Sequence, residues 1–527
     1  MPSDDHVFRL IRSMSPAEKR HFKLYTSRHL LAGHSKLHAL FDAIGSMSRF
    51  DEAALRHRFA GDASMKRLPI AKRRLYEAVL ESLDAFHAGS SVDDRLRRML
   101  HQTEILFGKA LYADASKLLR SARALAGTHQ RPAMLLQAAE WERRIMERSN
   151  YAGISDAQLA ERARRVAAVA DEWKEADALW SLKGDSFRLL FHSGQNPGRR
   201  ELERMRSLEN HPLLANGAAL HGAYARFLHH HVRSALAFAR NDLHTCEDQL
   251  KCCARIVEGE GDRLSDSAAL LLGVMGNLAH VRMRAGRHQE ALDDFRKFRQ
   301  LPLMMKQAPN PDLEMKLFVM GFSLELSVLS AQGEFAKAMA RAEGLEAGLE
   351  RHGRQVSTVR RAELMLQAAY ACFGAGHPGQ ALRWCNRLLS EGGIEAFTEV
   401  HALGRMLNLA VLVELGRTDH LAYVVRNTRR QLQRKGQPFA MESLLLGHAL
   451  DLVKDAEGKA KGDSWRLLHA DLAAHFAKGP EAALLDQVDF LLWAQAGAEG
   501  RTMEELARER WQARLKGQRL PKPKQAA

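Results

Sequence analysis

The amino-acid sequence predicts an all-α protein, an α-solenoid of about eight helical hairpins with helical caps at both ends. Two observations lead to this prediction. Segment after segment carries apolar residues at three- and four-residue steps, the spacing of one face of an α-helix. Small or apolar anchor residues also recur along the chain at intervals of 40 to 47 residues. With 14 prolines, 7% aromatic residues and few runs of valine, isoleucine and threonine, the composition fits a helix-rich chain.

The clearest hairpin lies at residues 270–302 and folds back at Gly286. Ala279 in its first helix and Ala291 in its second are small enough to let the two backbones approach closely. Phe295, one turn after Ala291, fills the space beside them. We therefore interpret these residues as framework positions of the fold.

The spacing of Ala279, Ala291 and Phe295, with Ala-Gly-Arg in the turn, resembles the tetratricopeptide repeat (TPR), a helix-turn-helix unit. The aromatic residue that this family usually carries early in its first helix is absent, and Met275 stands near that place. The resemblance implies a member of the TPR-like α-solenoid superfamily, with hairpins stacked into a right-handed superhelix that binds partners.

Residues 1–90 predict a basic, helical N-terminal subdomain. Ser15, Pro16 and Glu18 have the chemistry of a helix start: a capping serine, a proline in the first turn and an acid three residues after the cap. The segment from Ser15 to Tyr25 also resembles the start of a group of uncharacterised bacterial TPR-like proteins, which offers no activity to carry over. Further helices are expected at 36–47, 51–59, where Asp51 is the cap, and 69–86.

Residues 95–436 predict the repeats. The position of Ala291 recurs in the other units at Ala115, Leu159, Leu202, Cys246, Ala338, Ala381 and Leu421. Asparagine or glycine, which suit a tight turn between helices, stand four or five residues before five of the anchors, at Asn241, Gly286, Gly333, Gly376 and Gly416. The period near 44 exceeds the roughly 34 residues of a standard TPR, so each unit is expected to hold two helices of about 18 to 20 residues.

Residues 437–516 predict a C-terminal helical cap, because the repeat register loosens there. Helices are expected at 441–454, 465–478, 481–496 and 503–516. An end repeat exchanges one apolar face for a polar one, and Trp493 and Trp511 are expected to be exposed candidates for self-association. The oligomeric state stays open. The basic, proline-containing tail at 517–527 is expected to be disordered.

The charge and the cysteines bear on partners and compartment. A formal net charge of +15 and a pI near 9.7 favour an acidic partner or nucleic acid, although basic solvated faces explain the excess equally well. The start of the chain lacks the pattern of a secretory signal, and no run of about 18 apolar residues predicts a membrane span. Five unevenly placed cysteines fit a reducing compartment. A cytoplasmic protein is therefore expected.

No catalytic, cofactor or metal site is predicted. Cys246, Cys252 and Cys253 lack the spacing of zinc ligands, and we expect Cys246 and Cys253 to be buried structural residues. Three successive histidines at 229–231 point about 100° apart on a helix, so they do not share one ion, and one of them is expected to face a groove. The phosphate-binding glycine motifs and the common hydrolase motifs are missing.

Two basic clusters are candidate contacts for nucleic acid or an acidic partner. In the first, Lys72, Arg73 and Arg74 are expected on the outward side of the helix at 69–86; the full set is Lys66, Arg67, Lys72, Arg73 and Arg74. The helices at 51–59 and 69–86 have too long a connection for a DNA-binding helix-turn-helix, which favours a capping role. In the second cluster, Arg430 and Arg434 are spaced to hold one phosphate or carboxylate, or to complement the end of their helix dipole.

The sequence therefore predicts a non-enzymatic scaffold or adaptor that binds a protein or peptide in its groove, with the basic residues favouring acidic segments. The alternative is a nucleic-acid-linked regulator, in which the N-terminal helices contact DNA or RNA and the solenoid senses a second partner. A third hypothesis is an enzyme with a pocket in the superhelix, which no motif favours.

Overall fold

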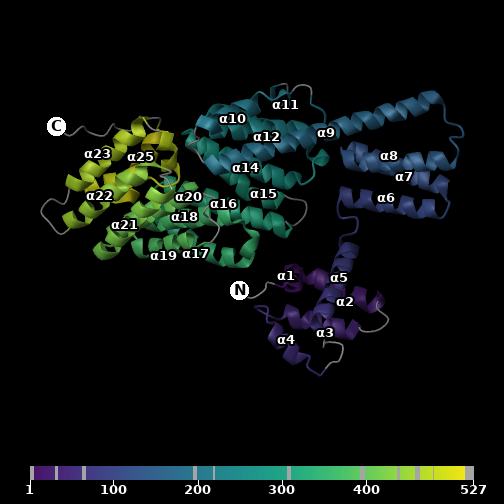
Figure 1. Ribbon diagram of the computed structural model, residues 1–527, viewed down its shortest axis with the longest axis horizontal. Coiled ribbons are helices and arrows are strands. Elements are labelled where there is room, and N and C mark those ends of the chain that lie inside the picture. Colours follow the sequence, from purple (N-terminus) through teal and green to yellow (C-terminus); the bar gives the residue numbers. More distant parts are fainter. Residues whose placement is uncertain are drawn as a thin grey trace. The chain divides into compact units, whose positions relative to one another are not determined.

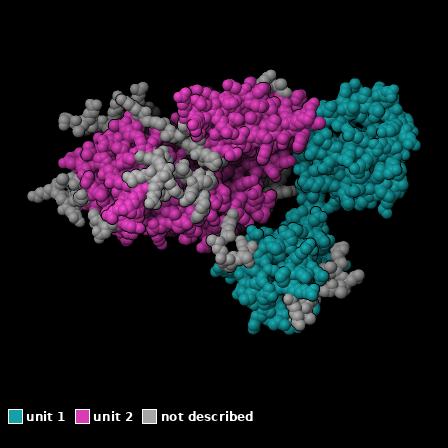
Figure 2. Space-filling view, in the orientation of Figure 1, with its two compact units in different colours: residues 1–169 teal, residues 170–527 magenta. Residues whose placement is uncertain are grey.

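The structure, a computed structural model, describes residues 5–29, 34–61, 67–193, 199–215, 217, 220–304, 310–391, 398–435, 439–456, 463–478 and 480–516. Every regular element in these ranges is a helix, so the predicted all-α class is confirmed. The chain divides into two compact units, residues 1–169 (unit 1) and 170–527 (unit 2), coloured separately in Figure 2.

Unit 1 begins with five helices that share one core: α1 (His6–Ser13), α2 (Pro16–His29), α3 (His34–Gly45), α4 (Glu52–Arg58) and α5 (Leu68–His87). The rings of Phe22 and Phe41 stack in this core with centroids 4.4 Å apart. The predicted helix start is confirmed, because the Ser15 N–H donates to the Glu18 carboxylate at 2.6 Å and the Glu18 N–H donates to the Ser15 hydroxyl at 3.3 Å. Asp51 likewise caps α4.

Three further helices of unit 1 pack side by side: α6 (Val92–Gly108), α7 (Tyr112–Thr128) and α8 (Pro132–Arg148) (Figure 1). Ala115 is fully buried at the start of α7, as expected of an anchor. In the α6–α7 turn Ala110 has a φ of 60°, so a non-glycine residue occupies the left-handed conformation that the later turns give to glycine or asparagine.

The predicted repeat fails between residues 156 and 215. A single helix of 38 residues, α9 (Asp156–Ser193), replaces the expected hairpin, and two short helices follow, α10 (Arg199–Glu209) and α11 (Pro212–Ala215). Leu159, expected to be an anchor, is 43% exposed, and Leu202 is only partly buried. The cause is local: α9 contains no proline and is rich in alanine, leucine, arginine and glutamate, so nothing ends the helix.

Unit 2 contains five hairpins in succession, whose paired helices lie side by side in Figure 1. They are α12 (Ala223–Ala239) with α13 (Leu243–Glu260), α14 (Ser267–Arg284) with α15 (His288–Met304), α16 (Pro311–Ala331) with α17 (Phe335–His352), α18 (Thr358–Gly374) with α19 (Pro378–Ser390), and α20 (Thr398–Glu414) with α21 (Thr418–Lys435). Each first helix also packs against the first helix of the next hairpin, apart from α12 and α14, which are connected through α13.

The turns and anchors of these five hairpins stand where the sequence predicts them. Positive φ angles between 60° and 76° occur at Asn241, Gly286, Gly333, Gly376 and Gly416. The residues that follow in the second helices are at most 2% exposed: Cys246, Ala291, Ala338, Ala381 and Leu421. Ala279 is fully buried and shares a small core with the partly buried Phe295.

The C-terminal segment of unit 2 comprises α22 (Ala440–Ala456), α23 (Asp463–Lys478), a 3-10 helix η6 (Pro480–Asp486), α24 (Phe490–Glu499) and α25 (Met503–Leu515). The helix expected at 481–496 is therefore split by the turn before Phe490. The segment folds back onto earlier helices, because Asp486 pairs with Arg284 of α14 at 2.7 Å and α25 packs on α15 and α16. The predicted tail lies outside the described residues.

Two predicted surface residues are buried by this arrangement. Trp493 and Trp511 are only 4% and 5% exposed, so the expectation that they offer a surface for self-association is wrong. The Trp493 indole N–H donates to Glu414 at 2.7 Å, and the Trp511 ring lies 4.5 Å from the ring of His288. Both tryptophans hold the C-terminal segment against the hairpins instead.

Candidate functional site

A cavity of about 1700 Å³ lies within unit 2. Its walls come chiefly from the first helices α12, α14, α16 and α18 on one side and from η6, α24 and α25 of the C-terminal segment on another. Pockets for small ligands usually measure roughly 300 to 1000 Å³. The cavity is therefore large enough for more than one small molecule, and it exists because the C-terminal segment folds back over the hairpins.

Uncharged polar side chains from three successive hairpins line the cavity. The Gln367 amide of α18 donates to the Ser323 and Ser327 hydroxyls of α16, at 3.1 and 3.0 Å. The Gln367 carbonyl oxygen is buried and has no hydrogen-bond partner among the described residues. Asn277 of α14 also contributes to the lining. These groups offer hydrogen bonds without offering charge.

Three histidines of the cavity are held in the neutral form. Burial lowers the pKa of His231, His280 and His288 to about 4. Nearby cations, including Lys183 beside His231 and Arg284 beside His280, lower these pKa values further. Each ring therefore presents one donor and one acceptor nitrogen at neutral pH.

The histidine triplet divides as the helix geometry predicts. Nδ1 of His229 lies 2.9 Å from the backbone carbonyl oxygen of Leu213, and Nδ1 of His230 lies 2.8 Å from the side-chain oxygen of Gln249. His231 alone lines the cavity, beside the ring of Phe187 at 5.1 Å. The three rings therefore lie in three different environments, and the predicted groove-facing histidine is His231.

We expect the stability of unit 2 to decrease as the pH falls from 6.5 toward 4. The folded chain keeps His231, His280 and His288 neutral down to about pH 4, whereas the unfolded chain protonates them near 6.5. The unfolded state then binds more protons, so the free energy of unfolding decreases by up to about 1.4 kcal/mol per pH unit for each histidine. Hydrogen exchange of α14 amides between pH 7 and 5, corrected for intrinsic rates, measures the slope.

The variant His280→Asn is expected to have a shallower slope, because one titrating group is removed. His244→Asn, at a histidine whose side chain is 89% exposed, should keep the wild-type slope. Identical slopes in wild type and His280→Asn would contradict this account.

The buried thiols are unreactive. Cys246 and Cys253 are buried, as predicted, and burial raises the pKa of Cys246 to about 12 and that of Cys253 further still. Both are therefore protonated at neutral pH and serve as small apolar residues. Within the described ranges, no three His, Cys, Asp or Glu side chains are grouped to hold a metal ion.

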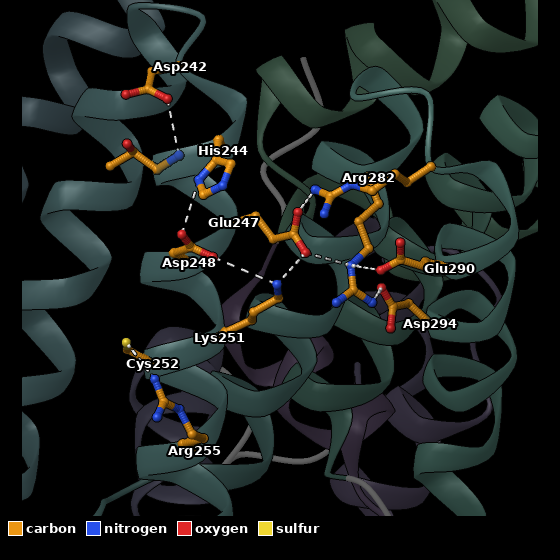
Figure 3. A network of polar contacts seen from close by, with 12 residues as sticks. Asp242, His244, Glu247, Asp248, Lys251, Cys252, Arg255, Arg282, Glu290 and Asp294 are labelled. Atoms are coloured by element: carbon orange, nitrogen blue, oxygen red, sulfur yellow. Dashed lines mark hydrogen bonds and ion pairs between the residues drawn. The ribbon is translucent and has the colours of Figure 1, made fainter. Parts of the chain in front are cut away.

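A network of polar contacts joins α13, α14 and α15 (Figure 3). Glu247, only 1% exposed, pairs with Arg282 at 3.2 Å, with Lys251 at 2.8 Å and with Arg287. Arg282 also pairs with Asp294 at 2.7 Å. Each buried charge faces an opposite one, and the network includes the turn beside Gly286, so it is a structural fastening of two hairpins.

The first basic cluster is placed differently from the prediction. Lys72, expected to face outward, is turned inward: its side chain is 12% exposed and pairs with Asp5 at 2.5 Å and Glu52 at 2.9 Å. Burial alone lowers the pKa of Lys72, but the hydrogen bonds to Asp5 and Glu52 outweigh it and raise that pKa. Lys72 therefore fastens α1 and α4 to α5 and is not presented to a partner.

The other described residues of the two predicted clusters are exposed. Arg67, Arg74 and Arg430 are exposed, and Arg73 is exposed while pairing with Glu77 at 2.9 Å. Lys66 and the side chain of Arg434 lie outside the described residues. Arg430, the described member of the second cluster, does not line the cavity of its unit.

Replacing Lys72 by methionine is expected to lower the stability of the N-terminal helices by about 2 kcal/mol, between the values for exposed and buried pairs. The loss follows because the Asp5 side chain, 6% exposed, is left without its cation. Arg74→Met, two residues away on the exposed face, is the matched control and should cost less than about 0.5 kcal/mol. Hydrogen exchange of α5 amides measures both, and equal effects would contradict the inward placement.

Sequence reasoning missed the polar lining. The sequence does contain a signal for this lining. Ser323 and Ser327 interrupt the apolar helix α16 at a four-residue step, and Gln367 interrupts the apolar run of α18. No described helix is long and apolar enough to cross a membrane. Comparison with known protein families finds no match to this sequence, and comparison with curated proteins finds none either.

Proposed function

We propose that this chain is a TPR-like, right-handed α-solenoid that acts as a scaffold or adaptor, binding a protein or peptide segment in the interior cavity of unit 2 without transforming it. The cavity of about 1700 Å³ carries the proposal. The five regular hairpins, with their buried anchors and left-handed turns, support the assignment to this class.

The size of the cavity favours a peptide over a small metabolite. A helix about 10 Å across that rises 1.5 Å per residue occupies roughly 120 Å³ per residue, so about 1700 Å³ has room for roughly 14 helical residues. Binding by a helix seated between helices is a common recognition mode. The lining suits binding more than chemistry, because burial lowers the pKa of His280 to about 4, which makes its ring a weak base, and Cys246 is protonated at neutral pH.

Selection of a random 14-residue peptide library, displayed on phage, tests this function. The immobilised full chain is compared with Ser323→Phe and Ser327→Phe, which narrow the cavity. Each variant leaves Gln367 one of its two hydroxyl partners. Ser207→Phe, on the exposed side of α10 in the same unit, is the matched control.

Peptides are expected to be enriched on wild type and Ser207→Phe and to bind the two cavity variants at least about tenfold more weakly. Circular dichroism first establishes that all four chains are folded. Because there are two cavity variants, the test still works if one of them does not fold. Equal enrichment on all four would overturn the cavity as the site. If a lipid is extracted from the purified chain in a one-to-one ratio and identified by mass spectrometry, the proposal that the cavity binds a peptide is overturned.

A further inference from the structure

We infer that the cavity selects a predominantly apolar segment without net charge, and not an acidic one. This inference rests on the proposed function and names the chemistry of the partner at the same site. It departs from the expectation drawn from the net charge of +15. The argument depends on where that charge lies.

The positive excess of the chain does not lie in the cavity. The lining includes five arginines and six acidic residues, and its histidines at 231, 280 and 288 are neutral at neutral pH. The described part of the lining therefore carries no net positive charge that would attract an acidic segment. The basic residues that raise the pI of the chain lie elsewhere on its surface.

Six of the charged side chains of the lining form three ion pairs with one another. Arg284 pairs with Asp486 at 2.7 Å, and Arg360 pairs with Glu363 at 2.7 Å. A third pair joins Arg510 and Asp489 at 2.9 Å. A carboxylate or ammonium group of a ligand that meets one of these pairs either breaks the pair or loses its own hydration without gaining a partner. Both outcomes oppose binding, because a desolvated charge without a partner is costly.

The remaining lining favours apolar contact with a few uncharged hydrogen bonds. Phe187 and Phe238 line the cavity, as do the apolar side chains Met320 and Leu324 of α16. The Gln367, Ser323 and Ser327 group, which also lines the cavity, adds neutral donors and acceptors. A segment with apolar residues at helical spacing and occasional serine, asparagine or glutamine is complementary to it.

Three synthetic libraries of 14-residue peptides test the inference. All three carry Leu, Ile, Phe or Met at positions 1, 4, 5, 8 and 11, and Ala, Ser, Asn or Gln elsewhere. Two of the apolar positions are replaced by Glu in the acidic library and by Lys in the basic library. Retention of each library is measured on the full chain, on Ser327→Phe and on Ser207→Phe.

The neutral library is expected to be retained by wild type and Ser207→Phe at least about tenfold better than the two charged libraries, and to lose that advantage on Ser327→Phe. Stronger, cavity-dependent retention of the acidic or basic library overturns the neutral class and leaves the proposed function standing. Retention of all three libraries that is unchanged by Ser327→Phe overturns the proposed function itself.

Discussion

Replacing Glu247 by alanine is expected to lower the local stability of the hairpins α12–α13 and α14–α15 by about 4 kcal/mol, within the range for removing one partner of a buried ion pair. The Glu247 side chain is 1% exposed, whereas the Arg282 side chain that it neutralises is 15% exposed. Without the carboxylate, Arg282, Arg287 and Lys251 converge on an apolar gap with too few acids to balance them. The charge imbalance, and not the lost volume, dominates the cost.

Asp248→Ala supplies the matched control on the same helix. Asp248 is the next residue, but its side chain is 51% exposed and its contact with Lys251 is 3.7 Å long. Its removal should cost less than about 1 kcal/mol. Native-state hydrogen exchange of amides in α13, α14 and α15 measures both variants locally, which matters because a chain of two units does not unfold as one. Similar losses for the two acids would contradict the central role given to Glu247.

The hairpins could be predicted because their signals are local. Gly286 has a φ of 76°, a conformation that side chains oppose, and Ala291 is fully buried where two helices approach. Both requirements concern neighbours within one hairpin, so they appear directly in the sequence. The same reasoning failed at Leu159, where the period was extended across a segment whose own residues continue the helix.

The cavity could not be predicted because it depends on contacts between distant parts of the chain. Arg284 and Asp486 are 202 residues apart in sequence, and neither belongs to a recognisable motif. The pattern of an end cap predicts exposure of Trp493 and Trp511, because the sequence does not show that the C-terminal segment folds back onto the hairpins. Amphipathic patterns show that a helix has an apolar face, but they do not show which helix covers it.

Replacing Arg284 by methionine is expected to release the C-terminal segment from the hairpins. The Arg284 side chain is 5% exposed, pairs with Asp486, donates to the Asn241 side chain at 2.9 Å and lies over the ring of Phe238. Burial raises the pKa of Asp486 and Arg284 lowers it, so the variant leaves a carboxylate that is held by no strong partner. We expect amides of α24 and α25 to exchange about a hundredfold faster, equivalent to about 2.7 kcal/mol.

Two comparisons separate release of the segment from general damage. Arg501→Met, at an arginine between α24 and α25 that pairs with Glu499 and Glu509 of the same segment, should change exchange little. In Arg284→Met combined with Asp486→Asn, the uncompensated carboxylate is gone, so exchange in α25 should be slower than in Arg284→Met alone. If the double variant exchanges as fast as the single one, the ion pair does not hold the segment.

The junction around Arg284 explains why a single pair has this influence. One guanidinium nitrogen of Arg284 and both ring nitrogens of the buried His288 have no hydrogen-bond partner in the described part of the chain. Buried polar atoms left unpaired oppose docking by about 1 to 3 kcal/mol each. Burial of Trp511 and Leu506 and the Arg284–Asp486 pair therefore hold the docked segment in place. The unpaired polar atoms of Arg284 and His288 oppose docking. Removing the pair shifts the equilibrium toward the undocked segment. An undocked segment no longer completes the wall of the cavity.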